Sequence, residues 1–397
     1  MPVISAPRVV AGGQVLRPGA VVVEGDRIAE VLPGRPPAGR GHLSLEHGVL
    51  IPGLVDLQVN GFAGVDLARA GPAGWASVAR AVAATGVTSF LPTLITAPIE
   101  ALAAGLARAR AARAREDLGA REDPGAREDL GARILGVHLE GPFLSPARRG
   151  AHDPRAMLDP APEVVDRLLD AGEGILALMT LAPEREGAVE AVARLVGAGV
   201  VVSVGHSDAR AAEVAAAVDA GARMVTHLFN AQRGLHHREP GVAGQGLADP
   251  RLTLGLIADL EHVHPLVCRM AMAAAPGRVA LVTDATAAAG MPPGRYRLGG
   301  EGGEMVELSQ QGPPLRADGT LAGSALRLDR AVANVAGLGV GLADAVAAAT
   351  RVPADLLGRT DLGRLAPGAL ADLAWLDDGL RALATWVGGI PAGPASP

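Results

Sequence analysis

The sequence predicts an α/β protein: a (β/α)8 barrel of the TIM type with a small β-sandwich domain built from both ends of the chain. Eight apolar segments of strand character alternate with Ala-rich helical stretches, which is typical of a parallel barrel. Several of these segments end on a charged or polar side chain, and both ends of the chain carry short alternating strands with tight turns. Because parallel barrel strands end at one rim, we expect these polar side chains to meet there.

The barrel strands are expected in the central part of the chain, residues 51–354. The strand candidates, in order, are 49–60, 87–95, 134–141, 175–183, 200–207, 224–230, 252–259 and 279–284. Helical stretches such as 76–85, 188–198 and 209–220 lie between them, each followed by Gly before the next strand. A doubly wound open sheet is the alternative architecture, but no GxGxxG motif follows the first strand.

The remaining segments are expected to lie outside the barrel. Residues 1–50, with the hairpin-like VVVEGDRIAEVLPG, and residues 355–390 are expected to form the small β-sandwich domain. Residues 115–132 read REDLGA, REDPGA, REDLGA, a low-complexity hexapeptide-repeat insertion that we expect to be solvated and mobile. The Gly- and Pro-rich residues 287–322 are expected to form a long excursion that covers the substrate.

The composition excludes several classes of protein. A formal net charge of −6 over 397 residues gives no excess of basic side chains, so it argues against nucleic acid as a main partner. The only cysteine, Cys268, excludes an intramolecular disulfide and a multi-Cys zinc site, which leaves His and carboxylates as ligands. The longest uncharged run, 81–99, contains Gly and Pro and predicts a helix end, a turn and a buried strand rather than a membrane span. We therefore expect a cytoplasmic protein without nucleic-acid or membrane partners.

Three side chains at strand ends are candidate metal ligands: Glu140, His206 and His227. One carboxylate and two imidazoles make the set typical of hydrolytic zinc, which keeps its fourth position for water. Each histidine alone would be interpreted as a hydrogen-bonded core residue, but three such side chains at one barrel rim indicate a metal site. Asp284 ends the eighth strand segment and is a candidate general acid/base. The alternative for Asp284 is a helix cap or an anchor of the next loop.

Other polar residues in the loops after the strands are candidate substrate contacts. Arg238 follows the sixth strand segment, and a guanidinium there suits a phosphate, which it can bind through two hydrogen bonds. His138 precedes Glu140 by two residues, so it shares that face of the strand and is expected to pack in the interior. The full set of candidate contacts is His152, Asn230, Ala231, Arg238 and His262.

The chain resembles the N-acetylglucosamine-6-phosphate deacetylases of the amidohydrolase superfamily. The resemblance lies in PGLVDLQVNGFAGVD, GVHLEGPFLSPARRGAHDP, VGHSDA, THLFNA, HHREPG, LVTDATAAAG and DGTLAGSAL, which extend from the first barrel strand to the last. It implies a metal-dependent barrel with a small β-sandwich, removal of acetate from the sugar 6-phosphate, and a homodimer. In that homodimer the residues matching Arg238 and His262 contact the phosphate of the substrate in the neighbouring subunit.

The resemblance also assigns roles by position. It implies that the metal ligands are Glu140, His206 and His227, that Asp284 is the acid/base, and that the remaining substrate contacts include Ala151, His152, Asn230, Ala231, Leu321, Ala322 and Gly323. Many amidohydrolases hold a second ion with His-x-His at the end of the first strand. Here Gln58 and Asn60 take that place, and neutral amides bind metals poorly, so we expect one divalent ion per subunit: Zn, with Fe, Mn or Co as alternatives.

Two positions depart from the family pattern. Gln232 stands where relatives often have Met, and Leu260-Glu261 replaces a Gly-containing pair before His262. The function expected is metal-dependent deacetylation of N-acetylglucosamine 6-phosphate to glucosamine 6-phosphate and acetate. The alternatives are another amidohydrolase acting on a different N-acyl or cyclic amide, or a metal-free barrel that serves as a non-catalytic scaffold.

Overall fold

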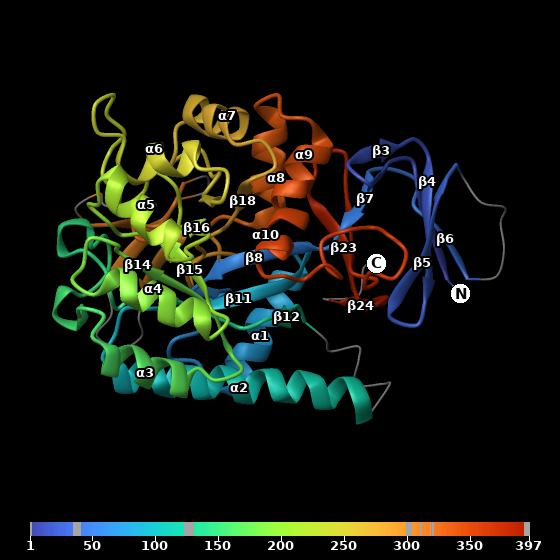
Figure 1. Cartoon of the computed structure of the whole chain (residues 1–397). Helices are drawn as coiled ribbons and strands as arrows, with labels where there is room; N and C mark the ends of the chain where they lie inside the picture. The colour runs from blue at the N-terminus through green and yellow to red at the C-terminus, as the bar shows by residue number, and fades with distance from the viewer. Residues whose placement is uncertain are drawn as a thin grey trace.

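The computed structural model describes residues 2–34, 41–122, 131–298, 304–309, 312–317, 319 and 321–392. A parallel barrel wrapped by helices makes up the larger part of the molecule, and sheets formed by both ends of the chain lie beside it (Figure 1). Among the described helices, none combines the length and the apolar character that crossing a membrane requires.

Eight parallel strands of the described chain form a nearly closed barrel. They are β8 (Leu54–Val59), β11 (Val87–Ile95), β13 (Val137–Glu140), β14 (Leu176–Leu181), β15 (Val201–Val204), β16 (Met224–Val225), β17 (Thr253–Leu256) and β18 (Val279–Leu281). Each pairs with the next in parallel, and β12 (Arg133–Ile134) also pairs with β11. The end of β8 meets the segment that follows β18 through a parallel bridge between Val59 and Ala285. The predicted (β/α)8 fold class is thus confirmed.

Helices cover the outside of this barrel with one apolar face each. In α4 the buried residues Ala188, Ala191, Val192 and Leu195 recur at the spacing of one helix face. Several helices begin with Pro at the first turn, where its missing N–H costs no hydrogen bond. The helices are α1 (Pro72–Ala83), α2 (Ile99–Glu122), α3 (Pro162–Ala171), α4 (Ala188–Gly197), α5 (Ala211–Asp219), α6 (Gly241–Ala248), α7 (Pro265–Ala274), α8 (Leu328–Gly337), α9 (Leu342–Ala348) and α10 (Arg351–Leu356).

The two ends of the chain build two sheets with a core of their own. One sheet has the order β5-β4-β1-β6, from β1 (Val3–Ala6), β4 (Gly19–Glu24), β5 (Arg27–Pro33) and β6 (His42–Ser44). The other has the order β24-β23-β22-β7-β2-β3, from β2 (Val9–Ala11), β3 (Gln14–Leu16), β7 (Val49–Pro52), β22 (Leu373–Leu376), β23 (Ala382–Val387) and β24 (Ile390–Ala392). Ile4, Val21, Leu50 and Leu373 belong to the core that they share. We propose that this sandwich is the small domain expected at 1–50 and 355–390, with its strands continuing to Pro52 and Ala392.

The predicted first strand, 49–60, is two strands in the structure. Its first part is β7 in the sandwich, and its second part is β8 in the barrel. Gly53 separates them, and a Cβ atom on it would lie 2.2 Å from Oγ1 of Thr88, too close for any other residue. The chain therefore passes from one domain to the other at the only residue type that fits there.

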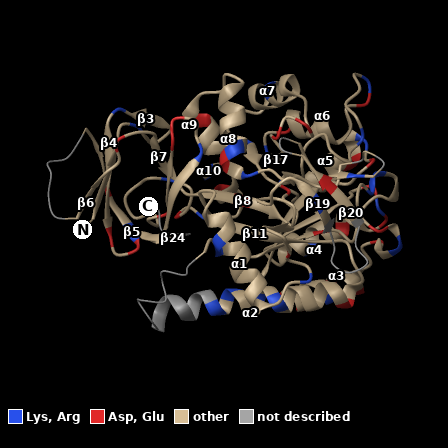
Figure 2. Ribbon diagram, turned by 180° about the vertical axis from the view of Figure 1, so that it is seen from behind, with Lys and Arg blue, Asp and Glu red and all other residues tan. Residues whose placement is uncertain are grey.

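Two segments that interrupt the alternation of barrel strands and helices have regular structure of their own. Helix α2 extends into the repeat region as far as Glu122, while residues 123–130 lie outside the described residues. Arginines are visible along α2 in Figure 2, and Arg110 donates to the backbone oxygens of Ala171 and Glu173 at the end of α3. The excursion 287–322 contains the antiparallel strands β19 (Gly294–Leu298), β20 (Glu304–Leu308) and β21 (Leu315–Arg316) rather than loop alone.

Candidate metal centre and active-site cavity

The candidate ligands and the candidate acid/base lie at the carboxyl ends of four barrel strands. Glu140 is the last residue of β13, His206 and His227 follow β15 and β16 by two residues, and Asp284 follows β18 by three. The φ angles of His206, His227 and Asp284 are 47°, 24° and 50°. Positive φ strains a residue with a side chain and persists where the surrounding structure holds it, often at functional sites.

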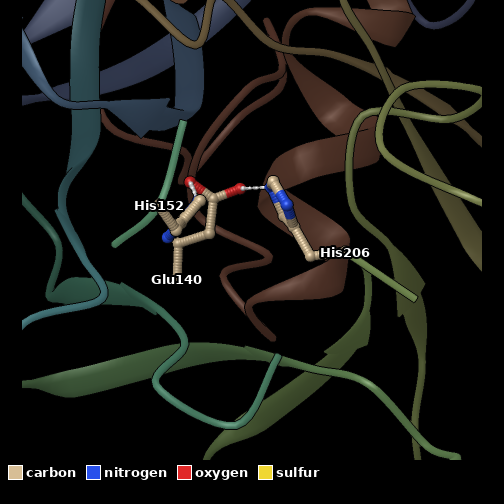
Figure 3. Close-up of side chains that lie close together, drawn as sticks. All are labelled: Glu140, His152 and His206. Carbon is tan, nitrogen blue, oxygen red and sulfur yellow. Dashed lines mark ion pairs between the residues drawn. The ribbon is translucent and has the colours of Figure 1, made fainter. Parts of the chain in front are cut away.

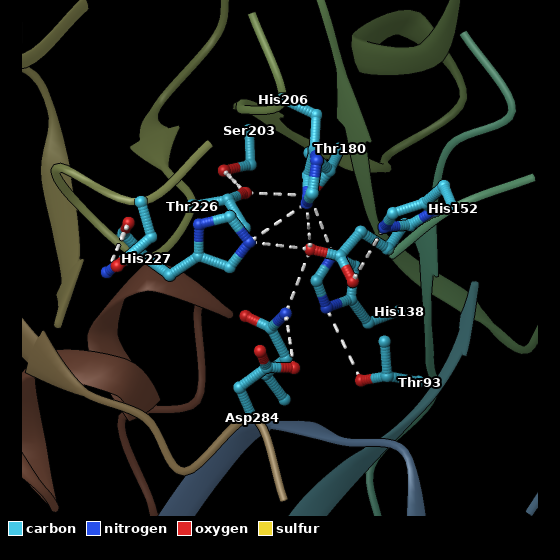
Figure 4. Close-up of polar contacts among 12 residues, drawn as sticks. Thr93, His138, His152, Thr180, Ser203, His206, Thr226, His227 and Asp284 are labelled. Atoms are coloured by element: carbon cyan, nitrogen blue, oxygen red, sulfur yellow. Dashed lines mark hydrogen bonds and ion pairs between the residues drawn. The ribbon is translucent and has the colours of Figure 1, made fainter. Parts of the chain in front are cut away.

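The three candidate ligand atoms surround one point (Figure 4). Nε2 of His227 lies 2.9 Å and Nε2 of His206 lies 3.3 Å from the same oxygen, Oε1 of Glu140. The two Nε2 atoms are 3.1 Å apart. Tetrahedral ligands at about 2.1 Å from zinc are themselves roughly 3.4 Å apart, so these atoms fit one divalent ion.

Glu140 is an anion in this cluster. Although burial alone would raise the pKa of its carboxyl, hydrogen bonds and charge interactions with His206 and His227 outweigh burial and hold that pKa well below its usual value. For His227, burial favours the neutral form, but the hydrogen bond to Glu140 and the charges of Glu140 and Asp284 together outweigh burial and raise its pKa. A buried carboxylate facing two imidazole nitrogens is a donor set that suits a cation.

A third histidine, His152, lies beside Glu140 and His206, and its position also permits a ligand role (Figure 3). The hydrogen-bond partner of Nδ1 in each ring shows whether Nε2 carries a proton or a lone pair, and only a lone pair can bind a metal ion. Nδ1 of His206 lies 2.9 Å from the backbone oxygen of Arg148, which only accepts, so Nε2 of His206 keeps its lone pair. The backbone N–H of Thr96 donates to Nδ1 of His152 at 3.3 Å, so this nitrogen is an acceptor. The Thr96 hydroxyl, 2.9 Å from the same nitrogen, donates to the backbone oxygen of Glu140 at 3.1 Å.

The proton of His152 is therefore on Nε2, which lies 3.7 Å from Oε2 of Glu140. Burial lowers the pKa of His152 to about 3, so the ring is neutral at neutral pH. A neutral ring with its proton on Nε2 donates a hydrogen bond and does not bind a metal ion through that atom. Among the described residues, Nδ1 of His227 has no hydrogen-bond partner, so nothing fixes its proton on Nε2, and a neutral His227 can bind an ion through Nε2 with its proton on Nδ1. This favours His227 over His152 as the third ligand.

Gln58 and Asn60 hold the two carboxylates of the site. Nε2 of Gln58 donates to Oε1 of Glu140 at 3.0 Å and to Oδ1 of Asp284 at 3.1 Å, and Nδ2 of Asn60 donates to the same Oδ1 at 2.7 Å. Burial, followed by repulsion from Glu140, raises the pKa of Asp284 to about 6. An acid with a pKa near 6 can accept a proton and return it near neutral pH.

A chain of buried hydroxyl groups lies beside the candidate ligands (Figure 4). His138 contacts Oγ1 of Thr180 through Nε2 at 2.7 Å, Thr180 contacts Thr226 at 2.7 Å, and Thr226 contacts Ser203 at 2.5 Å. Burial lowers the pKa of His138 to about 4, so its ring is neutral. His138 is thus an interior residue, as its position in the sequence predicts.

The cluster opens into a cavity of about 660 Å³. Most residues expected at the site line it: Asn60, Glu140, Ala151, His152, His206, His227, Asn230, Ala231, His262, Asp284, Leu321, Ala322 and Gly323. Gln58 lies behind this wall, and Arg238 is on the surface outside it. Glu261 is exposed and does not line the cavity, and Nδ1 of its neighbour His262 lies 2.6 Å from Oδ2 of Asp259.

Sequence reasoning missed several residues of the cavity wall. Asp66 ends the hairpin of β9 (Gly61–Phe62) and β10 (Val65–Asp66), which follows β8 directly, and Arg69 lies in the turn after it. Arg316 comes from β21. The signal for the first two was their place just after the carboxyl end of the first barrel strand. The position of Arg316, inside a Gly-rich excursion, had no comparable signal.

The fold and the donor set define a class of protein, the barrel hydrolases that use a divalent metal ion. Residues 49–394 match the model of the amidohydrolase family, and the chain belongs to that family, as its motifs predicted. It is 41% identical over 344 residues to N-acetylgalactosamine-6-phosphate deacetylase of Escherichia coli O157:H7, an alignment covering 86% of this chain and 87% of that protein.

Two further similar proteins are named as deacetylases of N-acetylglucosamine 6-phosphate. N-acetylglucosamine-6-phosphate deacetylase of Vibrio furnissii is 37% identical over 342 residues, which cover 86% of this chain and 82% of that protein. The solved structure of N-acetyl-D-glucosamine-6-phosphate deacetylase from Mycobacterium smegmatis, in complex with N-acetyl-D-glucosamine-6-phosphate, has a TM-score of 0.87 at 37% identity and covers 99% of both chains.

Proposed function

We propose that this protein removes the acetyl group from N-acetylglucosamine 6-phosphate, releasing glucosamine 6-phosphate and acetate. The observation that carries the proposal is the convergence of Glu140, His206 and His227 around one point beside Asp284, at the wall of a cavity large enough for a sugar phosphate. The names of the similar deacetylases support the substrate class.

We assign Glu140, His206 and His227 as the metal ligands. A divalent ion held there supplies Lewis-acid polarisation of the acetyl carbonyl and lowers the pKa of water. Gln58 and Asn60 direct amide N–H groups, which repel cations, toward Asp284, and this supports one ion per subunit. Zinc suits one carboxylate and two imidazoles, with Fe, Mn and Co as alternatives.

Asp284 acts as the base and then as the acid. Its Oδ1 accepts both amide donors, which leaves Oδ2 to take a proton from the attacking water as the new C–O bond forms. Asp284 then gives that proton to the nitrogen as the C–N bond breaks, so that the amine and acetate leave. His152 donates from Nε2 to the acetamido group or to a sugar hydroxyl.

The remaining contacts bind the sugar and its phosphate. Ala151, Asn230 and Ala231 contact the sugar, and Leu321, Ala322 and Gly323 cover it, because all six line the cavity. We assign Arg238 and His262 to the phosphate in a homodimer. Arg238 would reach the substrate of the neighbouring subunit, as expected, whereas His262 lines the cavity of its own subunit and would contact the phosphate there. Support for a contact between subunits is the surface position of Arg238, outside its own cavity.

The galactosamine epimer is the second candidate substrate, since one of the most similar relatives bears that name. The test measures acetate release from both epimeric 6-phosphates, from unphosphorylated N-acetylglucosamine and from an N-acetylated amino acid, with and without chelator. Turnover of a 6-phosphate that chelator abolishes supports the proposal, and the faster epimer identifies the substrate. Preference for the amino acid would indicate another amidohydrolase activity, and no turnover of any substrate with metal present would indicate a scaffold.

A further inference from the structure

His206 is held by a hydrogen bond on the ring edge that faces away from the other candidate ligands. Its Nδ1 donates to the backbone oxygen of Arg148 at 2.9 Å. A cavity-lining glycine, Gly150, packs so close to the ring that a Cβ atom there would lie 3.1 Å from Cε1 of His206. The backbone of His206 is itself strained, with φ at 47°, so its neighbours must hold it in place. The loop that carries Arg148 therefore decides where the ligand nitrogen points.

The carboxylate of Asp208 fixes that loop. Nε and Nη2 of Arg148 both lie 2.8 Å from Oδ1 of Asp208. On the other side, Nη2 of Arg233 donates to Oδ2 at 2.5 Å, and Nε of Arg233 donates to the backbone oxygen of Asp208 at 2.6 Å. Asp208 thus joins the loop after β13 to the loop after β16, from a position two residues beyond His206.

Asp208 is in turn anchored from the loop after β14. Its backbone N–H donates to Oε1 of Glu184 at 2.6 Å, and the hydroxyl of Ser207 donates to Oε2 at 2.7 Å. The side chains of Arg148, Asp208 and Arg233 are 38%, 31% and 32% exposed, so they are not part of the apolar core. Ion pairs as exposed as these contribute little to overall stability. Loss of the Asp208 charge is therefore expected to disturb the orientation of His206 more than folding.

We propose that Asp208 is a positioning residue for the metal centre: by clamping Arg148 it orients His206 and sets the affinity of the site for a divalent ion. The proposal rests on the ligand set assigned under the proposed function. Asp208 touches neither the ion nor the substrate. Partners of this kind, one step removed from a metal, typically change metal affinity about 10- to 100-fold when they are replaced.

The experiment titrates Zn²⁺ into chelator-treated protein in the presence of a competing chelator and measures the dissociation constant. D208N is expected to weaken Zn²⁺ binding about 10- to 100-fold. R148Q keeps the backbone oxygen that His206 contacts but removes the guanidinium, so it should weaken binding in the same direction. The matched control is D166N, which removes the partner of Arg194 in an ion pair between α3 and α4 with 48% and 44% exposed side chains. D166N should leave the Zn²⁺ affinity unchanged.

Two further readouts separate positioning from folding. At saturating Zn²⁺ the kcat of D208N should return toward that of the wild type with KM unchanged, and the ion-free D208N protein should unfold at the temperature of ion-free D166N. Wild-type Zn²⁺ affinity in D208N, or a markedly lower unfolding temperature of its ion-free form, would overturn the proposal. If the wild-type protein itself takes up no divalent ion, the proposed function fails, which is a different outcome from equal uptake by both proteins.

Discussion

Substitution of Asp284 by Asn changes one atom of the proposed centre and leaves its surroundings in place. Gln58 and Asn60 both donate to Oδ1 of Asp284, so in D284N the side-chain oxygen should occupy that position, where the two donors need an acceptor. The new NH2 group then replaces Oδ2, the atom that has to accept a proton. We expect D284N to fold and to bind its metal ion but to lack the base.

The expected loss of turnover follows from that missing proton acceptor. A positioned general acid/base contributes about 10²- to 10⁴-fold, so kcat/KM of D284N should fall by that factor, or roughly 3 to 5.5 kcal/mol of transition-state stabilisation. Burial and repulsion from Glu140 raise the pKa of Asp284 to about 6. Because the ionised form is the base, wild-type kcat/KM should fall as the pH falls through that value. A bound cation lowers the pKa of Asp284, so the fall in kcat/KM on the acidic side should lie at pH 6 or below.

The assay follows acetate release against pH and measures bound metal in each protein. The matched control is D66N, since Asp66 is another carboxylate of the same cavity wall whose pKa burial also raises. D66N should keep the turnover of the wild type and should show the same fall in kcat/KM at acidic pH. A D284N protein that binds metal and turns over within about tenfold of the wild type would refute a role for Asp284 in proton transfer.

Three other substitutions test the structure around the centre. Q58L removes hydrogen bonds from Glu140 and Asp284, so it should lower kcat and metal affinity roughly 10- to 100-fold with little change in KM. G53A should lower the free energy of unfolding by about 1 to 3 kcal/mol in urea, whereas G71A, with open space around it, should not. Burial raises the pKa of Asp56 to about 7, so the folded protein keeps a proton that the unfolded chain loses near pH 4. Stability should therefore fall from about pH 4 to 7, less steeply in D56N.

The barrel and the four side chains of the proposed centre could be predicted because their signals are local. Each strand is a short apolar run bounded by Gly, Pro or polar residues, and each side chain of interest comes at or just after the end of such a run. The one-rim geometry of a parallel barrel then places Glu140, His206, His227 and Asp284 together. The strand lengths were less predictable: the strand predicted at 224–230 is β16 in the structure, which covers only Met224–Val225.

Other features depend on contacts between distant segments and leave no local pattern. The run 49–60 has the composition of a single strand, and only the closeness of Thr88 to Gly53 shows why it divides between two sheets. Gln58 and Asn60 are recognisable in the sequence as poor ligands, but their hydrogen bonds to Asp284 cross from β8 to the end of β18. The Gly- and Pro-rich composition of 287–322 indicates a loop, yet antiparallel pairing forms β19 and β20 there.

The roles of His152 and His206 illustrate why composition at a site does not determine chemistry. In the sequence, His152 and His206 are equivalent imidazoles in loops that follow barrel strands. In the structure their Nδ1 atoms face opposite kinds of group, a donating N–H of Thr96 and an accepting oxygen of Arg148. The first leaves a proton on Nε2 and makes a hydrogen-bond donor, and the second leaves a lone pair and makes a ligand. Because both partners belong to loops other than the ones that carry the histidines, ligand and donor are distinguished only once the loops have packed.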